Sequence, residues 1–164
     1  MKKQKKILFV ASEAVPFVKT GGLGDVCGAL PKYLRQLGHD VRVVLPRYRR
    51  IHSANQTKWI FPMGVQMGNG VLWSGVLETE SEGVPVYLIE HNEFFDRDGI
   101  YDNGQWEYPD NAARFGFFCR AAIQLCRDVG FQPDIIHCHD WQTALIPAYL
   151  KTWEANDPFF KNTA

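Results

Sequence analysis

A glycine-rich loop is the first segment whose residue types and spacing could do chemistry. It reads Lys19-Thr-Gly-Gly-Leu-Gly-Asp25 and leads into a helical pattern of apolar residues. Glycines allow a tight turn and a close approach of the backbone to a ligand, and the free amide groups of a helix N-terminus attract an anion. Lys19 adds a flexible cation. The loop therefore predicts a phosphate site, and the alternative is a tight strand-to-helix turn with an exposed lysine.

The glycine spacing argues against the two best-known nucleotide loops. The NAD fingerprint would need glycines at positions 22, 24 and 27, and residue 27 is cysteine. No acidic residue that could bind a ribose occurs between Val41 and Leu77, where Arg47, Arg49 and Arg50 stand instead. Because an arginine can accommodate a 2′-phosphate, an NADP-dependent oxidoreductase domain stays open as an alternative. A P-loop is excluded, since no Gly-Lys-Ser/Thr follows the glycines.

The segment His137-Cys-His-Asp-Trp141 is a second candidate site. It follows an apolar run that predicts a strand, and open α/β sheets bind ligands at the carboxyl ends of their strands. Side chains alternate along a strand, so we expect His137 and His139 to point one way and Cys138 the other, and we expect no zinc. A buried histidine followed by a capping Asp140 is one interpretation. A polar site facing the glycine loop is favoured, because both segments end strands at the same sheet edge.

The segment Tyr108-Pro-Asp-Asn-Ala-Ala-Arg-Phe115 is a third polar cluster. Pro109 and Asp110 suit the start of a helix, so Asp110 is either an N-cap or a site residue. Arg114 is expected on a solvated helix face unless it joins the same site. The aromatic residues of 94–101 could stack on sugar rings, or they could form a small hydrophobic cluster under a long loop.

Alternating strand and helix patterns must position these segments. The apolar run 7–11 predicts a buried strand, and apolar residues then recur at steps of three and four over 23–37, which predicts one face of a helix that ends at Gly38. Pro31 lies inside this pattern and is expected to kink or restart the helix. With a second strand at 41–45, the segment forms a βαβ unit with a parallel strand pair.

The rest of the chain continues the pattern. Residues 58–90 alternate apolar and polar residues around two turn signals, which predicts two or three strands joined as hairpins. A helix is expected over 115–129, a strand over 134–138 and a last helix after Asp140. The fold class is therefore α/β, with a Rossmann-like parallel sheet and a β-hairpin insertion.

Composition narrows the classes of function. The 164 residues suit one domain, and 18 basic against 18 acidic side chains leave no net charge to attract nucleic acid or an anionic membrane. The four cysteines form no CxxC pair, so free thiols in a reducing cytoplasm are expected. The five apolar residues after Lys6 are too few for a signal peptide, and no apolar run is long enough to span a membrane.

Taken together, the motifs resemble bacterial glycogen synthase and plant starch synthase. The resemblance begins with KILFVASEAVPFVKTGGLGDV, which starts at Lys6, and continues with GALPK from Gly28 and GHDVRVVLPRY from Gly38. It runs on through FDRDGIY, YPDNAARF and HCHDWQ, which end at residues 101, 115 and 142. The blocks occur in order along nearly the whole chain, which makes the set far more specific than any one of them.

The resemblance implies the N-terminal domain of a two-domain, GT-B glycosyltransferase. Such an enzyme transfers glucose from ADP-glucose to the non-reducing end of an α-1,4-glucan, with retention of configuration. It implies neither a metal nor another cofactor, because lysine, arginine and a helix N-terminus can neutralise a diphosphate leaving group. A cytoplasmic enzyme is expected, with ADP-glucose and the glucan as partners.

The resemblance also implies roles for single residues. Lys19 would hold the diphosphate or the donor sugar, and the adjacent glycines would let the loop approach the donor. His139 would contact the transferred glucose, and Asp110 would lie near the reacting carbon. The residues that the resemblance implies bind the substrate all lie in the glycine loop: Lys19, Gly21, Gly22 and Asp25.

The sequence differs from the family in being much shorter. The C-terminal nucleotide-binding domain has no counterpart in the sequence, so residues 1–164 are expected to be an incomplete N-terminal domain that is inactive alone. A non-catalytic module that binds a glucan or a nucleotide sugar is the alternative. Glycogen affinity without turnover would favour that module, and binding of NADPH but not ADP-glucose would favour the oxidoreductase.

Overall fold

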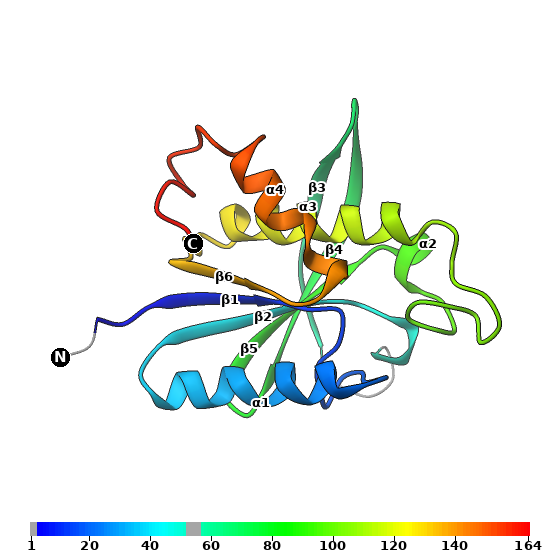
Figure 1. Ribbon diagram of the computed structural model, residues 1–164, viewed down its shortest axis with the longest axis horizontal. Coiled ribbons are helices and arrows are strands. Elements are labelled where there is room, and N and C mark those ends of the chain that lie inside the picture. Colours follow the sequence, from blue (N-terminus) through cyan, green and yellow to red (C-terminus); the bar gives the residue numbers. More distant parts are fainter. Residues whose placement is uncertain (1–2, 52–56) are drawn as a thin grey trace.

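A six-stranded sheet lies at the centre of the computed structural model, which describes residues 3–51 and 57–164. The strand order is β3-β4-β5-β2-β1-β6. Figure 1 shows α1 on one face of the sheet and α3 and α4 on the other. The expected α/β class is therefore confirmed. The strands are β1 (Lys6–Val10), β2 (Asp40–Pro46), β3 (Lys58–Met67), β4 (Gly70–Ser81), β5 (Val84–Glu90) and β6 (Ile135–Cys138).

The strands β5, β2, β1 and β6 run parallel to one another, as the βαβ pattern predicts. Val10 at the end of β1 pairs with Val44 of β2 on one side and with Cys138 of β6 on the other. The carboxyl ends of these strands therefore meet at one edge of the sheet, where α/β folds bind ligands. The glycine loop after β1 and the histidine segment after β6 both begin at this edge.

The hairpin insertion expected over 58–90 is present. β3 pairs with β4, and β4 pairs with β5, both in antiparallel register. Gly68, Glu82 and Gly83 adopt positive φ angles at the two turns, which is the conformation that tight hairpins favour. Figure 1 shows the β3–β4 ribbon projecting beyond the other strands.

The helices end where glycines allow the chain to turn. Gly38 and Gly130, at φ of 92° and 63°, follow α1 and α3 as the sequence predicts. α3 carries an almost continuous buried run from Arg114 to Cys126, because it packs against both the sheet and α4. The helices are α1 (Gly22–Gln36), α2 (Asn92–Phe95), α3 (Asn111–Asp128) and α4 (Leu145–Lys151), with short 3-10 turns at η1 (Arg49–Ile51) and η2 (Trp141–Thr143).

α1 departs from its expected form in two ways. It continues through Pro31 to Gln36 as one helix, so the proline does not restart it. Three residues of the expected apolar face, Val26, Tyr33 and Leu37, are largely exposed. The fully buried positions of α1 are Gly24, Cys27 and Pro31, which recur at steps of three and four. Cys27 belongs to the expected apolar face, whereas Gly24 and Pro31 lie beside that face on the helix.

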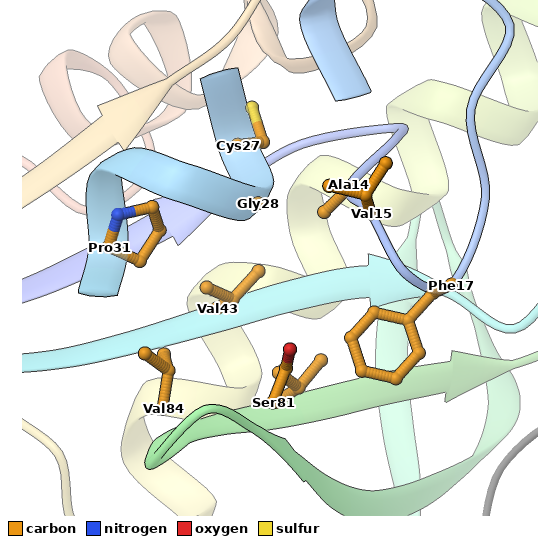
Figure 2. Close-up of a pocket in the computed structure, with 10 residues that line it drawn as sticks. Ala14, Val15, Phe17, Cys27, Gly28, Pro31, Val43, Ser81 and Val84 are labelled. Carbon is orange, nitrogen blue, oxygen red and sulfur yellow. The ribbon is translucent and has the colours of Figure 1, made fainter. Parts of the chain in front are cut away.

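Small residues bring α1 close to the loop that precedes it. A Cβ atom on Gly28 would lie 2.7 Å from the carbonyl oxygen of Val15 and would also overlap its side chain. Figure 2 shows Gly28 near Val15 of this loop and Pro31 above Val43 of β2, around a small cavity of about 10 Å³. The close contact fixes the course of residues 11–21, and thereby the glycine loop.

No helix in the described part of the chain is long and apolar enough to cross a membrane.

Candidate functional site

The glycine loop joins β1 to α1, as predicted. β1 ends at Val10, Lys19 lies in the irregular segment that follows, and α1 begins at Gly22 with Gly21 as its N-cap. Gly21 lacks a side chain, so no side-chain hydrogen bond caps the helix. A Cβ atom on Gly21 or Gly22 would meet nothing within 4 Å, which places the backbone of these residues beside open space. A ligand can therefore approach the start of α1 closely.

Two loop amides expected to be free for an anion already have a partner. Glu13, which is almost fully buried, accepts hydrogen bonds from the amides of Thr20 and Gly21. The Thr20 hydroxyl donates to the same carboxylate at 2.6 Å. Burial alone would raise the pKa of Glu13, but these hydrogen bonds outweigh it and hold the pKa below its usual value. The expectation of free amides is wrong at these two positions, because an internal anion occupies them.

Lys19 lies over the first turn of α1. Its ammonium donates to both carboxylate oxygens of Asp25, at 2.8 and 2.6 Å. The two side chains are about half exposed, at 47% and 58%. Exposed ion pairs contribute little free energy, so a ligand with more negative charge can displace Asp25.

Tyr101 connects the glycine loop to the histidine segment. Its hydroxyl donates to Glu13 at 2.6 Å and lies 2.8 Å from the hydroxyl of Ser12. Burial and the bond to Glu13 raise the pKa of Tyr101, so the phenol keeps its proton. Its ring lies 6.2 Å from that of Trp141, which is half exposed. Sequence reasoning missed Glu13 and Tyr101 as site residues, since a lone glutamate and a lone tyrosine give no spacing signal.

His139 occupies the carboxyl end of β6. Its ring stacks on Phe9 at 5.3 Å and lies 4.3 Å from the ring of His137, so the two histidines share a face as predicted. Burial and the neighbouring His137 lower the pKa of His139 to about 4, which leaves the imidazole neutral at pH 7. Its Nε2 atom is buried and has no hydrogen-bond partner among the described residues. A buried unpartnered nitrogen beside a binding edge marks a candidate ligand contact.

The residue after His139 has a strained backbone. Asp140 adopts φ 64° and ψ −176°, a region that is open mainly to glycine. Its carboxylate accepts from the amide of Trp141 at 2.7 Å, and the Thr143 hydroxyl donates to the His139 carbonyl at 2.9 Å. Asp140 thus caps the short η2 turn and not, as expected, the last helix α4, whose N-cap is Ala144. Strain that is held in this way is typical of functional sites.

Cys138 lies on the other side of β6. It lines a hollow together with Ile136 and Ile146, away from the two histidines. Within residues 3–51 and 57–164, no three His, Cys, Asp or Glu side chains are grouped so that they could hold a metal ion.

Asp110 is the N-cap residue of α3, but its carboxylate does not cap the helix. Instead it accepts two hydrogen bonds from the Arg97 guanidinium, at 2.8 and 2.6 Å. Those hydrogen bonds lower the pKa of Asp110, which is therefore ionised at neutral pH. Among the described residues, no hydrogen bond or ion pair joins Asp110 to Lys19 or His139.

Arg114 is fully buried, so its expected place on a solvated helix face is wrong. Its guanidinium donates to the carbonyl oxygens of Phe94 and Ile100 and to the side chain of Asn111. It thereby ties both ends of the segment that leads to Tyr101. A charge inside an apolar helix pattern is the signal that could have indicated this role.

Two of the three arginines after β2 are paired with carboxylates rather than left for a 2′-phosphate. Arg47 is paired with Glu90, and Arg49 is paired with Asp96 and Asp98 at 2.8 and 2.5 Å. These carboxylates neutralise the cations that an NADP phosphate would need. The pairing argues against the oxidoreductase alternative.

Comparisons with known proteins identify the family of the chain. The starch synthase catalytic domain family matches residues 6–164. In fold, the chain is similar to the catalytic domain of starch synthase IV from Arabidopsis thaliana bound to ADP and acarbose, with a TM-score of 0.86 and 31% identity over 98% of this chain and 33% of that one.

Two bacterial relatives are also similar to nearly all of this chain and are likewise about three times as long. The glycogen synthase of Geotalea uraniireducens is 48% identical, and glycogen synthase 2 of Geobacter metallireducens is 51% identical. The alignments cover 96% and 97% of this chain and 33% of each relative, so the chain spans about a third of the length of the curated relatives it matches. The family that the motifs indicate is confirmed: the chain belongs to the starch synthase catalytic domain family.

Proposed function

We propose that this chain forms one wall of the active site of a retaining glucosyltransferase, which transfers glucose from ADP-glucose to the non-reducing end of an α-1,4-glucan. The observation that carries the proposal is the meeting of two surfaces at one sheet edge. One is the open glycine backbone with Lys19, and the other is the neutral, stacked ring of His139. The starch synthase relative bound to ADP and acarbose supports a nucleotide and a sugar chain as ligands.

Lys19 and the first amides of α1 are proposed to bind the donor diphosphate. When the sugar–phosphate bond breaks, negative charge grows on the departing ADP, and a nearby cation and helix N-terminus lower the barrier. Gly21 and Gly22 leave room for the phosphate oxygens, since neither position carries a side chain into the open space. Neutralisation by these groups is the reason that we propose no metal ion for this step.

Glu13 is proposed to hold the loop ready for the donor. Its hydrogen bonds fix Thr20, Gly21 and Tyr101 before any ligand arrives. Binding then requires less ordering of the loop, which favours affinity. Glu13 acts here as a positioning residue, because it is buried behind the loop.

His139 and Asp110 are proposed to act on the sugar. A neutral imidazole can form a hydrogen bond to a hydroxyl group of glucose without the cost of burying a charge. Asp110, near the reacting carbon, would stabilise the positive charge of the sugar as the bond to phosphate breaks. Because Arg97 keeps Asp110 ionised, its role is that of a fixed charge rather than a proton donor.

The opposite wall of the site is proposed to come from a C-terminal nucleotide-binding domain. The relatives are about three times as long as the aligned region, which leaves room for such a domain. Residues 1–164 would then be the N-terminal domain of a GT-B enzyme. The four cysteines are free thiols, which supports a cytoplasmic location.

Calorimetric titration of the 164-residue protein with ADP tests the donor site. Lys19→Ala should weaken ADP binding roughly tenfold, because a charge-assisted hydrogen bond to phosphate is lost. Lys32→Ala is the matched control, since Lys32 is a lysine of α1, the helix that the loop leads into, and it pairs with Glu82 away from the loop. Equal affinities for the wild type and Lys19→Ala would contradict the proposed donor site.

A further inference from the structure

Arg114 is a fully buried cation whose hydrogen bonds to described residues all go to neutral groups. The three acceptors are two backbone carbonyl oxygens and the side-chain oxygen of Asn111. The carboxylate of Asp110, which lies at the start of the same helix, pairs with Arg97 instead. A charge inside a protein is costly unless an opposite charge compensates it, so the compensation for Arg114 must come from further away.

Glu13 is a buried anion in the corresponding situation. It is almost fully buried, and the donors to its carboxylate are the amides of Thr20 and Gly21 and the hydroxyls of Thr20 and Tyr101. All of these donors are uncharged. The interior behind the glycine loop therefore contains two charges of opposite sign, which attract each other in its low dielectric even without direct contact.

Tyr48 lies close to both charges. Its ring packs edge-on against Phe95 at 5.9 Å, and the Arg114 guanidinium lies 5.7 Å from the same ring. Burial raises the pKa of Tyr48 well above its usual value, so the phenol keeps its proton at neutral pH. Tyr101 and Glu13 raise this pKa further, whereas Arg114 lowers it. The Tyr48 hydroxyl is thus within electrostatic range of the cation and of the anion.

Two buried polar atoms of this region have no hydrogen-bond partner within the described ranges. They are the hydroxyl oxygen of Tyr48 and Nη2 of Arg114. Tyr48 is only 1% exposed, so bulk water reaches neither atom. Buried polar atoms are nearly always satisfied by the protein or by an ordered water molecule. Nη2 can only donate, and the hydroxyl can donate and accept, so a water molecule can satisfy both.

We infer that Tyr48 and Arg114 bind one buried water molecule, which completes a polar connection between Arg114 and the hydrogen bonds of Glu13. The water would accept a hydrogen bond from Nη2 of Arg114 and donate one to the Tyr48 oxygen. The Tyr48 proton would then be available to the acidic side of the connection. A chloride ion is disfavoured at this place, because the charges of Arg114 and Glu13 offset each other and a third buried charge would have no counterpart.

This water would join three segments that form the candidate site. Tyr48 follows β2, Arg114 belongs to α3, and Glu13 holds the glycine loop. Because hydrogen-bonded groups in the interior polarise one another, loss of the Tyr48 hydroxyl should loosen the bonds from Thr20 and Gly21 to Glu13. Tyr48 would thereby act as a positioning residue for the loop, whichever ligand the loop binds.

Magnetic relaxation dispersion of water, which counts long-lived buried water molecules, tests the site in the 164-residue protein. Tyr48→Phe removes the hydroxyl with little change in ring volume and should hold one such water fewer than the wild type. Tyr87→Phe is the matched control, because Tyr87 is also buried but its hydroxyl accepts a direct hydrogen bond from Arg42 at 3.0 Å. The control should keep the wild-type number, and circular dichroism should show the same fold for all three proteins.

Hydrogen exchange measured by nuclear magnetic resonance tests the positioning role. In Tyr48→Phe, the exchange rates of the Thr20 and Gly21 amides should rise several-fold more than those of amides in β1 and β2. A general loss of stability would instead speed up exchange in the loop and the sheet together. In Tyr87→Phe, the loop amides should respond no more than the sheet amides do.

The outcomes separate the water site from the role of Tyr48. If Tyr48→Phe keeps the wild-type number of long-lived waters, or if a crystal structure shows a direct hydrogen bond from Arg114 to Tyr48, the water site is overturned. Stabilisation of the wild type, but not of Tyr48→Phe, by chloride relative to gluconate at equal ionic strength would overturn it too, because the site would then bind an anion. If the water is lost while loop and sheet amides respond alike, the positioning role is overturned and the water site stands.

Discussion

Glu13 is the residue that holds the candidate site together. Its carboxylate bonds to Thr20, Gly21 and Tyr101, which belong to two segments far apart in the sequence. The glycine-rich helix start predicts free amides in the loop. It does not show that the buried carboxylate of Glu13 accepts hydrogen bonds from two of them. Sequence spacing indicates which residues meet within one helix or strand, whereas the hydrogen bonds of Glu13 join two segments that are far apart in the sequence.

Replacement of Glu13 by glutamine tests the network. Glu13→Gln should destabilise the protein by about 1.5–3 kcal/mol at pH 7, because hydrogen bonds to a charged acceptor are lost. The pKa of Glu13 is lowered on folding, so its contribution is present above the unfolded pKa and is lost as the pH falls through the folded value. Urea unfolding of the variant should therefore depend less on pH at the acidic end.

The matched control for that change is Glu93→Gln, since Glu93 makes no side-chain hydrogen bond within the described residues. The control should unfold like the wild type at every pH. Equal stabilities of the Glu13 and Glu93 variants would show that the network contributes nothing.

His139 allows a direct test by nuclear magnetic resonance. Its ring signals should titrate with a midpoint near pH 4, since burial and His137 lower its pKa to about 4. The unfolded chain takes up this proton near pH 6.5, so stability should fall by about 1–2 kcal/mol between pH 7 and pH 5, an effect absent in His139→Gln. A midpoint above 6 would contradict the buried, neutral ring.

At the scale of elements, periodicity predicts most of the fold. The βαβ unit, the hairpins and the start of α3 follow from strand and helix patterns, because each is set mainly by local sequence. The face of α1 follows only in part, since Cys27, Leu30 and Leu34 pack on the core as expected, whereas Val26 and Tyr33 are exposed. The loop and the strand that α1 packs against, and not the apolar pattern alone, determine that small residues of the helix are the ones buried in the contact.

Two glycines of α1 should respond oppositely to alanine. Gly28→Ala should cost about 1–3 kcal/mol, because the added methyl group would overlap Val15. Gly22→Ala should leave stability unchanged or raise it by up to about 1 kcal/mol, since its Cβ would enter open space. If that space takes phosphate, Gly22→Ala should still weaken ADP binding. Thermal unfolding and calorimetry measure the two effects, and equal stabilities would disprove the close contact.

At the scale of the whole molecule, the proposed reaction needs two walls. The 164-residue chain should bind ADP and glucan weakly and should not transfer glucose, while a longer protein that continues into the second domain should. Loss of one wall removes charge stabilisation of several kcal/mol, and each 1.36 kcal/mol is a factor of ten in rate. Incorporation of radiolabelled glucose from ADP-glucose into glycogen measures the difference, and robust transfer by the short chain would refute it.

In that longer protein, two variants should change different kinetic constants. Lys19→Ala should mainly raise the KM for ADP-glucose, through the lost phosphate contact. His139→Ala should mainly lower kcat, because it would act on the reacting sugar. The motifs of the sequence predict both residues, whereas the contacts by which Arg114 positions Tyr101 from inside the fold are seen only in three dimensions.

The pairing of Lys19 with Asp25 turns donor recognition into a competition between two anions. A ligand must displace the Asp25 carboxylate to gain the ammonium, and because the exposed pair contributes little free energy, this competition lowers affinity only modestly. The free energy needed to break the pair is the same for ADP and for AMP. Asp25 would thus lower affinity without changing preference: Asp25→Asn should bind both nucleotides more tightly, by about the same factor.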